Sequence, residues 1–256
     1  MPAPINMFKR ALADRETLFG CWLSLADAGA AEIIGSTGFD WVLIDSEHAP
    51  NDIRSIRNQL SALQGSSSQV LVRVPVGETW LIKQVLDAGA QTVLVPMVES
   101  AEQARDLVRA CTYPPTGTRG VGATAARASR FGSYSDYIRT ADDQICLLVQ
   151  VENRAGIAAL DDILAVEGID GVFIGPSDLS TDMGYQGDVD APEVQDTIRD
   201  ALGRIDAAGK APGIMSLGEG TPAYLKAGAR FIAVAIDVVL LVKGARDTVA
   251  KWQGQT

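Results

Sequence analysis

Two acidic residues stand at positions suited to hold a metal ion. Glu152 and Asp178 each follow a strongly apolar run of the kind that forms a buried strand. Two carboxylates brought together at strand ends repel each other unless a cation lies between them. Carboxylate oxygens suit a hard divalent ion, with water or substrate completing the coordination shell. The alternative is structural, with Asp178 capping a helix and Glu152 forming a salt bridge.

His48 is the only histidine in the chain, so it is the sole imidazole candidate for moving protons. It lies three residues after Asp45, just beyond the end of another predicted strand. A carboxylate at that spacing can hold one ring nitrogen, fix the tautomer and raise the basicity of the ring. The pattern predicts a pair of His48 with Asp45, and the alternative is a loop histidine without a role.

Two further strand ends carry groups that can bind an anion. Arg73 lies in the apolar run 70–74 (VLVRV), and a buried arginine needs an anionic partner. Its planar fork can bind a substrate carboxylate, or it can form an internal salt bridge with Asp45 or Glu152. Residues 175–180 (GPSDLS) predict a tight turn into a short helix, where backbone N–H groups around Ser177 favour a carboxylate.

Together these groups suit a 2-oxo acid as the substrate. A divalent ion can chelate a carboxylate oxygen and the ketone, and the metal with an arginine can stabilise an enolate. A histidine that moves protons then completes the requirements for carbon–carbon bond chemistry beside a ketone. A Schiff-base mechanism is not expected, because the candidate lysines lie on predicted helices or before a strand.

These residues must be positioned by an alternation of strands and helices that runs along the chain. Near-continuous apolar strands separated by helices indicate a parallel sheet covered on both faces. The predicted strands are Leu18–Leu23, Trp41–Asp45, Val70–Val74, Thr92–Pro96, Ile145–Val151, Gly171–Ile174, Pro212–Met215 and Phe231–Ile236. Helices are predicted near 26–36, 52–63, 79–87, 100–110, 154–165, 193–208, 218–226 and 238–252.

Eight such units in 256 residues predict a single α/β domain over 1–256, a (β/α)8 barrel. Its active site would lie at the carboxyl ends of the strands, where the candidate residues fall. The alternative is a doubly wound open sheet, but 23–28 (LSLADA) is not the glycine-rich phosphate turn of that fold. The link 112–144 is long enough to suggest a functional loop, and 233–252 is apolar enough to suggest subunit packing.

Composition excludes several classes of protein. Apolar residues make up 47% of the chain and charged residues 21%, as in ordinary globular domains. With 22 basic and 32 acidic residues the net charge is −10, so neither nucleic acid nor an anionic membrane is an expected partner. The longest apolar run is too short to span a bilayer, and the N-terminus shows no signal-peptide pattern. Cys21 and Cys146 lie in apolar runs without zinc-site spacing, which predicts buried thiols in a reduced, cytoplasmic protein.

Several segments, taken in order, resemble the HpcH/HpaI family of metal-dependent (class II) pyruvate aldolases. Residues 39–50 (FDWVLIDSEHAP) resemble the second-strand signature of that family. Residues 149–152 (VQVE) and 172–180 (VFIGPSDLS) resemble its metal-binding strands. The similarity runs from about Gly20 to Thr248 and includes 73–75 (RVP), 86–90 (LDAGA) and 95–98 (VPMV).

The resemblance implies a barrel of the phosphoenolpyruvate/pyruvate type with a divalent metal ion. It implies that magnesium, manganese or cobalt is bound by Glu152 and Asp178. Pyruvate would be bound by Gln150 and by the backbone at Ser177, beside Asp178. The implied partners are a small 2-oxo acid, an aldehyde and further copies of the chain. The assembly would be a homo-hexamer, a trimer of dimers with exchanged C-terminal helices.

The resemblance also implies roles for the proton-moving and enolate-stabilising groups. His48 matches the acid/base of the family, with Asp45 as its partner. Asp87 matches a carboxylate that raises the basicity of that histidine, and Arg73 matches the residue that stabilises the enolate.

Within the family, residues 120–131 and 184–187 resemble the 4-hydroxy-2-oxoheptanedioate aldolases more than the 2-dehydro-3-deoxyglucarate aldolases. The implied reaction is reversible cleavage of 4-hydroxy-2-oxo acids to pyruvate and succinic semialdehyde or another aldehyde. Arg127 or Arg130 could hold the far carboxylate of succinic semialdehyde, or only fix the loop. Ser177 departs from the alanine of that branch.

Three other functions remain as alternatives. One is a sugar-acid aldolase of the glucarate type. Another is an acyl-CoA lyase like the citrate lyase β-subunit, but that lyase would need a basic groove, and the only basic cluster lies in 119–139. The third is a non-catalytic metabolite-binding barrel, which the complete set of candidate site residues disfavours.

Overall fold

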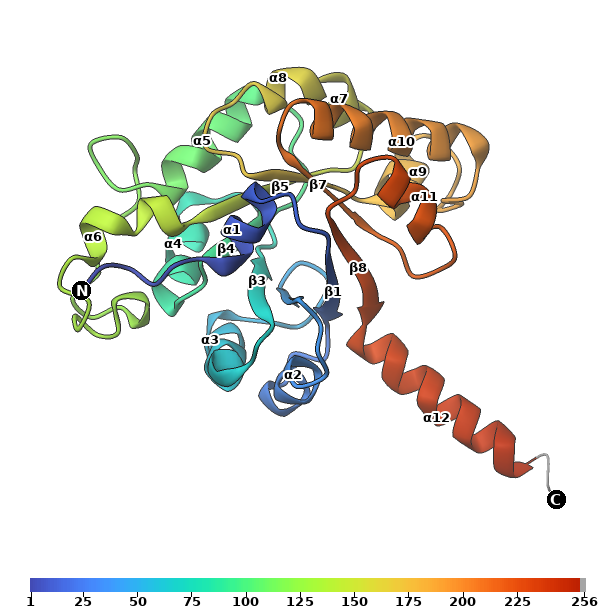
Figure 1. Cartoon of the computed structure of the whole chain (residues 1–256), viewed down its shortest axis with the longest axis horizontal. Coiled ribbons are helices and arrows are strands. Elements are labelled where there is room, and N and C mark those ends of the chain that lie inside the picture. The colour runs from blue at the N-terminus through green and yellow to red at the C-terminus, as the bar shows by residue number, and fades with distance from the viewer. Residues whose placement is uncertain (254–256) are drawn as a thin grey trace.

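The computed structural model, which describes residues 1–253, is a closed barrel of eight parallel strands surrounded by helices (Figure 1). Each strand pairs with the next along the chain, and the eighth pairs with the first. The barrel prediction is confirmed and the doubly wound alternative is wrong. The strands are β1 (Leu18–Leu23), β2 (Trp41–Asp45), β3 (Gln69–Arg73), β4 (Thr92–Val95), β5 (Cys146–Val151), β6 (Gly171–Ile174), β7 (Ala211–Met215) and β8 (Phe231–Ile236).

Helices separate the strands, close to where they were predicted. They are α2 (Ala28–Gly35), α3 (Ile53–Ala62), α4 (Thr79–Ala88), α5 (Ala101–Cys111), α7 (Arg154–Ala158), α8 (Leu160–Leu164), α9 (Pro176–Asp182), α10 (Pro192–Ala207), α11 (Thr221–Lys226) and α12 (Asp237–Gln253). The predicted helix 154–165 is in fact two helices, which meet at Ala159. Two short helices were not predicted, α1 (Met7–Ala13) before the barrel and α6 (Tyr137–Thr140) in the long link.

Aromatic side chains fill the interior of the barrel near its amino-terminal end. Trp41 and Phe231 stack edge to face with ring centroids 6.2 Å apart. Phe8 of α1 inserts between them, 6.2 Å from Trp41 and 5.8 Å from Phe231. Gly20 and Gly213 leave room for these rings, because a Cβ on either glycine would collide with Trp41 or Phe231. Burial of such large rings is a major source of barrel stability.

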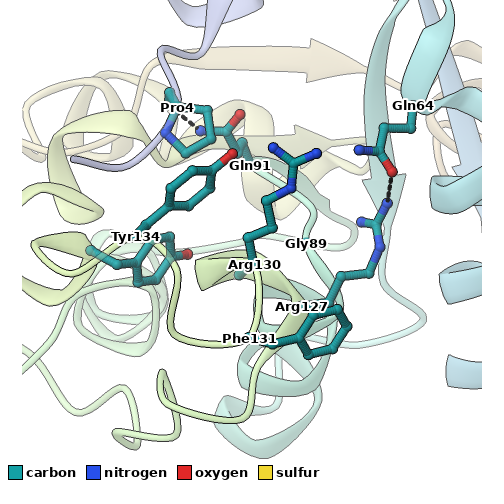
Figure 2. A pocket seen from close by; sticks show the side chains of 10 residues that line it. Pro4, Gln64, Gly89, Gln91, Arg127, Arg130, Phe131 and Tyr134 are labelled. Carbon is teal, nitrogen blue, oxygen red and sulfur yellow. Dashed lines mark hydrogen bonds between the residues drawn. The ribbon is translucent and has the colours of Figure 1, made fainter. Parts of the chain in front are cut away.

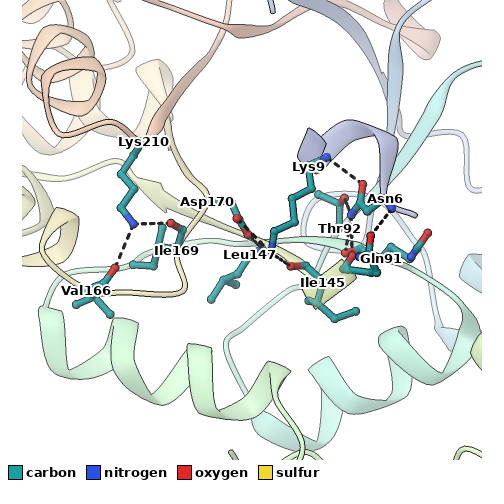
Figure 3. Close-up of polar contacts among 11 residues, drawn as sticks. Asn6, Lys9, Gln91, Thr92, Ile145, Leu147, Val166, Ile169, Asp170 and Lys210 are labelled. Atoms are coloured by element: carbon teal, nitrogen blue, oxygen red, sulfur yellow. Dashed lines mark hydrogen bonds and ion pairs between the residues drawn. The ribbon is translucent and has the colours of Figure 1, made fainter. Parts of the chain in front are cut away.

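The N-terminal segment is fastened across the end of the barrel where the strands begin (Figure 3). Nδ2 of Asn6 donates hydrogen bonds to Oγ1 of Thr92 at 3.0 Å and to backbone carbonyls. Nζ of Lys9 donates to the carbonyl of Ile145 at 2.7 Å and lies 3.4 Å from Oδ1 of Asp170. This end of the barrel is therefore closed, and the carboxyl ends of the strands are left for chemistry.

The C-terminal helix α12 projects away from the barrel instead of packing on it (Figure 1). Its apolar side chains are exposed, with Leu241 61% and Trp252 59% accessible. Its first residue, Asp237, is buried and accepts hydrogen bonds from the backbone N–H groups of Ser24 and Leu25. Across residues 1–253 no helix combines the length and the apolar character needed to cross a membrane.

Candidate active site

Arg73 is held rigidly at the end of β3 by two carboxylates. The register of β2 and β3 places Asp45 opposite Arg73, and its two oxygens accept hydrogen bonds from Nε and Nη2 at 2.8 Å. Oε2 of Glu47 lies 2.7 Å from Nη1. Burial opposes the charge on Arg73, but the hydrogen bonds and negative charge of Asp45, with that of Glu47, outweigh it and raise the pKa of the guanidinium. Arg73 therefore stays a fixed cation.

Glu152 follows β5 and is almost fully buried. Its Oε1 accepts a hydrogen bond from the backbone N–H of Met97 at 2.9 Å, and its Oε2 accepts one from Nε2 of Gln150. Met97 has a left-handed backbone (φ 56°), which is uncommon for a residue other than glycine. Such strained positions cluster at functional sites. Burial raises the pKa of Glu152 to about 7, and the negative charges of Asp178 and Glu47 add to this.

The turn after β6 presents Asp178 and Ser177 to solvent. Gly175 precedes α9, and Pro176 occupies its first turn, where the missing N–H costs nothing. The prediction of a tight turn into a short helix is confirmed. A Cβ at Gly175 would collide with the carboxylate of Glu152, so glycine is what lets β5 and β6 bring Glu152 and Asp178 to the same place.

The predicted pair of His48 with Asp45 is not formed. Both oxygens of Asp45 are engaged by Arg73, because these two residues are partners across neighbouring strands. His48 is 66% exposed, and its Nε2 lies 3.9 Å from Oε1 of Glu47. The internal salt bridge of Arg73 with Asp45, given above as the alternative, is therefore present, and Glu47 is the carboxylate nearest to the imidazole.

Asp87 lies at the other end of the barrel from His48. It occupies the last turn of α4, next to the start of β4, whereas His48 follows the end of β2. Its Oδ1 accepts a hydrogen bond at 3.0 Å from Arg119, which is fully buried against Tyr113 and Tyr137. One chain therefore does not bring Asp87 to His48, and the pairing implied by the resemblance would need a second copy of the chain.

Arg127 also lies away from these groups. Its Nη1 donates to the carbonyl of Ala88 and its Nη2 to that of Leu60, both at 3.1 Å. Arg127 thus fastens the long link to the ends of α3 and α4, and within one chain it plays the structural part that was given as the alternative.

The remaining predicted residues surround one open cavity of about 380 Å³ at the carboxyl ends of the strands. Glu152 lies directly behind its wall, hydrogen-bonded to Gln150. The predicted residues that line the cavity are Asp45, His48, Arg73, Gln150, Ser177 and Asp178. Apolar side chains complete the wall, namely Trp22, Phe173, Met215 and Ile236. A concave, largely apolar site with a few convergent polar groups is typical of small-molecule binding.

The donor atoms of this cavity fit a hard divalent cation. Glu152 and Asp178 bring two carboxylates to this place; burial chiefly raises the pKa of Glu152, and the charge of Asp178 adds to it. Oε1 of Gln150 is buried and has no hydrogen-bond partner within residues 1–253. All of these donors are oxygens, which suits magnesium or manganese. Among residues 1–253 no three His, Cys, Asp or Glu side chains gather into a metal site, so water or substrate would have to complete the shell.

Sequence reasoning missed Glu47 and the backbone of Met97. Glu47 stands two residues after Asp45, so the alternation of a strand that continued through it would have placed both side chains on one face. That signal was available but was overlooked in favour of His48. The left-handed backbone of Met97 has no signal in the residue type, because methionine seldom adopts it.

The chain is similar in sequence to a known family of aldolases and lyases. A family model described as HpcH/HpaI aldolase/citrate lyase matches residues 18–244. Over 99% of both sequences, the chain is 61% identical to a hydroxypyruvate/pyruvate aldolase of Roseovarius nubinhibens. It is 49% identical to a 4-hydroxy-2-oxo-heptane-1,7-dioate aldolase of Salmonella dublin, over 96% of this chain and 94% of that protein.

Among solved structures, the crystal structure of an HpcH/HpaI aldolase/citrate lyase family protein from Burkholderia cenocepacia J2315 superposes with a TM-score of 0.94. The two sequences are 39% identical, and the match covers 97% of this chain and 99% of that one.

Proposed function

Because the chain belongs to the HpcH/HpaI aldolase/citrate lyase family and is a carbon–carbon lyase, we propose that it is a metal-dependent pyruvate aldolase. It would reversibly cleave 4-hydroxy-2-oxo acids to an aldehyde and pyruvate, or to an aldehyde and hydroxypyruvate where C3 of the acid carries a hydroxyl. The observation that carries the proposal is the guanidinium of Arg73, anchored by Asp45 and Glu47 at the wall of a cavity that also holds His48 and Asp178. Such a fixed cation suits a developing enolate.

The proton and the electrons would move as follows. His48 takes the proton of the C4 hydroxyl, and the C3–C4 bond breaks to release the aldehyde. The electron pair of that bond forms the enolate of pyruvate, whose oxygen is stabilised by Arg73. Addition of a proton at C3 completes pyruvate. His48 is exposed and free of Asp45, so it can reach a substrate that fills the cavity.

Other residues would bind and orient the 2-oxo acid. Glu152 and Asp178 would hold a magnesium, manganese or cobalt ion, which when bound supplies Lewis-acid polarisation of the 2-oxo group. Gln150 and the backbone N–H at Ser177 would orient the carboxylate of pyruvate, since both residues line the cavity. Trp22 and Phe173 would exclude water from the reacting carbons.

The nucleophile half of the reaction is proposed to include hydroxypyruvate. Of the two relatives compared, identity is higher to the hydroxypyruvate/pyruvate aldolase (61%) than to the heptanedioate aldolase (49%). The narrower expectation of a heptanedioate aldolase is therefore replaced by a pyruvate aldolase whose aldehyde partner is open to test. The cavity is open, which suits aldehydes of different size.

The assay that tests this proposal is pyruvate release from 4-hydroxy-2-oxoheptanedioate by metal-stripped protein, repeated after magnesium, manganese or cobalt is restored. The same protein is tested in the reverse direction with hydroxypyruvate or pyruvate as the donor to one common aldehyde. Turnover only with metal, and with both donors, is expected. The proposal would be disproved by a folded protein that, with each of these metals added, neither releases pyruvate nor catalyses exchange of the C3 protons of pyruvate with solvent.

Two variants separate the roles of the site residues. His48→Ala is expected to lower turnover by about 100-fold or more while metal affinity stays at the wild-type value. Glu152→Gln is expected to weaken metal binding, measured by titration calorimetry with manganese. A His48→Ala protein that loses its metal would contradict the acid/base role.

The active unit is proposed to contain more than one chain. α12 leaves the barrel with its apolar side chains exposed, as an exchanged helix would. Asp87 lies too far from His48 of its own chain to act on it. Both observations support an assembly of more than one chain, for which the predicted form is a hexamer. Sedimentation of wild-type protein beside a chain ending at Val238, which keeps Asp237, tests it. A wild-type monomer with full activity would refute the assembly.

A further inference from the structure

A second cavity, of about 310 Å³, lies near the other end of the barrel, where the strands begin (Figure 2). We call it the basic pocket. It is open to solvent and lies between the long link, the turn after α3, the residues that lead into β4 and the N-terminal segment at Pro4. Its defining residues are Gln64, Gly89, Gln91, Arg127, Arg130 and Tyr134. No residue of the candidate active site lines it.

The basic pocket carries positive charge that no carboxylate offsets. Arg127 and Arg130 line it, and neither Asp nor Glu does. Within residues 1–253 neither arginine forms an ion pair, although acidic residues outnumber basic ones by 32 to 22 in the chain. Burial, and then the nearby charge of Arg57, lowers the pKa of Arg127. Arg127 is half-buried and Arg130 is exposed, so the pocket joins a fixed cation to one that solvent and ligand can reach, with no carboxylate among its lining residues.

The pocket is held in shape by the backbone around it. Arg127 is fixed by the carbonyls of Ala88 and Leu60, and it approaches Gly89 so closely that a Cβ there would lie 2.5 Å from its Nη1. Arg130 has a left-handed backbone with φ near 54°. Figure 2 shows the two guanidinium groups extending from this segment towards Gln64 and Gln91.

Arg130 and Tyr134 have donors that remain free within residues 1–253. Arg127 spends its Nη groups on backbone carbonyls and on Gln64, so it contributes chiefly a fixed charge. The guanidinium of Arg130 and the hydroxyl of Tyr134 make no hydrogen bond to any residue of the described chain. A planar guanidinium with free N–H groups binds two oxygens of a carboxylate or phosphate at once.

We propose that the basic pocket binds a small oxyanion, a carboxylate or a phosphate, at a site separate from catalysis. Arg130 would hold two oxygens of the anion, Tyr134 would donate to it, and Arg127 would add its fixed charge. A cavity of this volume is at the lower end of those that bind small molecules. A neighbouring cavity of about 290 Å³ shares four lining residues with the basic pocket and leaves room for a longer anion. The shared residues are Gln64, Gly89, Gln91 and Arg127.

The test uses the metal-loaded, full-length protein in titration calorimetry at low ionic strength. Inorganic phosphate and succinate are the two probes, and they distinguish a phosphate site from a carboxylate site. Arg130→Gln removes the charge and the fork but leaves a side chain that tolerates the same backbone. Arg139→Gln is the matched control, because Arg139 lies in the same link and its side chain is 86% exposed; among the described residues its guanidinium pairs only with Asp136, at 3.8 Å.

We expect saturable binding of at least one probe to wild-type protein, weakened about tenfold or more by Arg130→Gln and unchanged by Arg139→Gln. Arg130→Lys, which keeps the charge but loses the fork, is expected to lie between the two. The kcat/KM for pyruvate release is expected to be unchanged in Arg130→Gln. No saturable binding by either probe, or equal binding by Arg130→Gln, would overturn the proposal. So would a loss of kcat/KM in that variant, since it would place Arg130 in the catalytic machinery of another copy.

Discussion

Replacing Gly175 with alanine tests how closely turnover depends on the position of Glu152. The added Cβ would collide with Oε2 of Glu152. It would also lie 2.9 Å from the Cβ of Glu152 and 3.0 Å from Nε2 of Gln150. Gly175 has an ordinary backbone (φ −93°), so the effect is steric and not a matter of strain. The carboxylate must move by roughly 1 Å, a misplacement that costs about 100-fold in rate. Overpacking also lowers the free energy of unfolding by about 1–3 kcal/mol.

The assay for Gly175→Ala is kcat/KM for pyruvate release at saturating metal ion, with the melting temperature measured on the same samples. We expect kcat/KM to fall about 100-fold in protein that is still folded. Gly203→Ala is the control, because Gly203 is exposed on α10 and an added Cβ meets no atom within 4 Å. That change is expected to leave activity intact and to stabilise the helix by about 0.5–1 kcal/mol. Wild-type kcat/KM in folded Gly175→Ala would refute the reasoning.

Three further predictions follow from the geometry. Arg73→Lys keeps the charge but loses the fork that Asp45 holds, so exchange of the pyruvate C3 protons, followed by NMR, should fall about 100-fold. Lys9→Met removes the ion pair with Asp170 and the hydrogen bond to the carbonyl of Ile145, so the free energy of unfolding in urea should fall by about 1–3 kcal/mol. Loss of the exposed pair of Arg10 with Asp14 in Arg10→Met should cost under about 0.5 kcal/mol. Burial raises the pKa of the Cys111 thiol to about 12, so the reactive thiolate stays scarce below that pH. Iodoacetamide at pH 8.5 should therefore label Cys111 only in denaturant. Labelling of Cys111 in the native protein would contradict this.

The barrel could be predicted from the sequence because each strand is buried on both faces. Such strands are continuous apolar runs between helical stretches, and the predicted ends of β1, β2, β6 and β8 agree with the structure to the residue. α1 was missed because its seven residues are too few to show a helical period, and its stability comes from Phe8 inside the barrel. The break at Ala159 was missed for a related reason, since the apolar spacing runs through it.

The place of the site was predictable, but the pairing of its charges was not. Fold class alone puts strand-end residues together, and this located Arg73, Gln150 and Asp178 correctly around one cavity. Pairing depends on which residues of neighbouring strands share a register, and the sequence does not state that register. Asp45 was therefore assigned to His48, three residues away in sequence, and not to Arg73, its partner across β2 and β3. Asp87 was named from the resemblance alone, and its position in the last turn of α4 places it at the opposite end of the barrel from His48.

Two carboxylates, those of Asp45 and Glu47, hold the guanidinium of Arg73 at the place where it would contact the substrate. A guanidinium has five N–H groups; those of Nε and Nη2 each donate a hydrogen bond to Asp45, and Nη1 forms an ion pair with Glu47. The N–H groups that make no hydrogen bond to Asp45 point in directions fixed by these contacts, so they need no reorganisation when charge develops on a substrate oxygen. The paired carboxylates also raise the pKa of Arg73, so the cation persists in a buried setting. Asp45 and Glu47 thus act through Arg73, and of the two only Glu47 also lies near the imidazole that would move the proton.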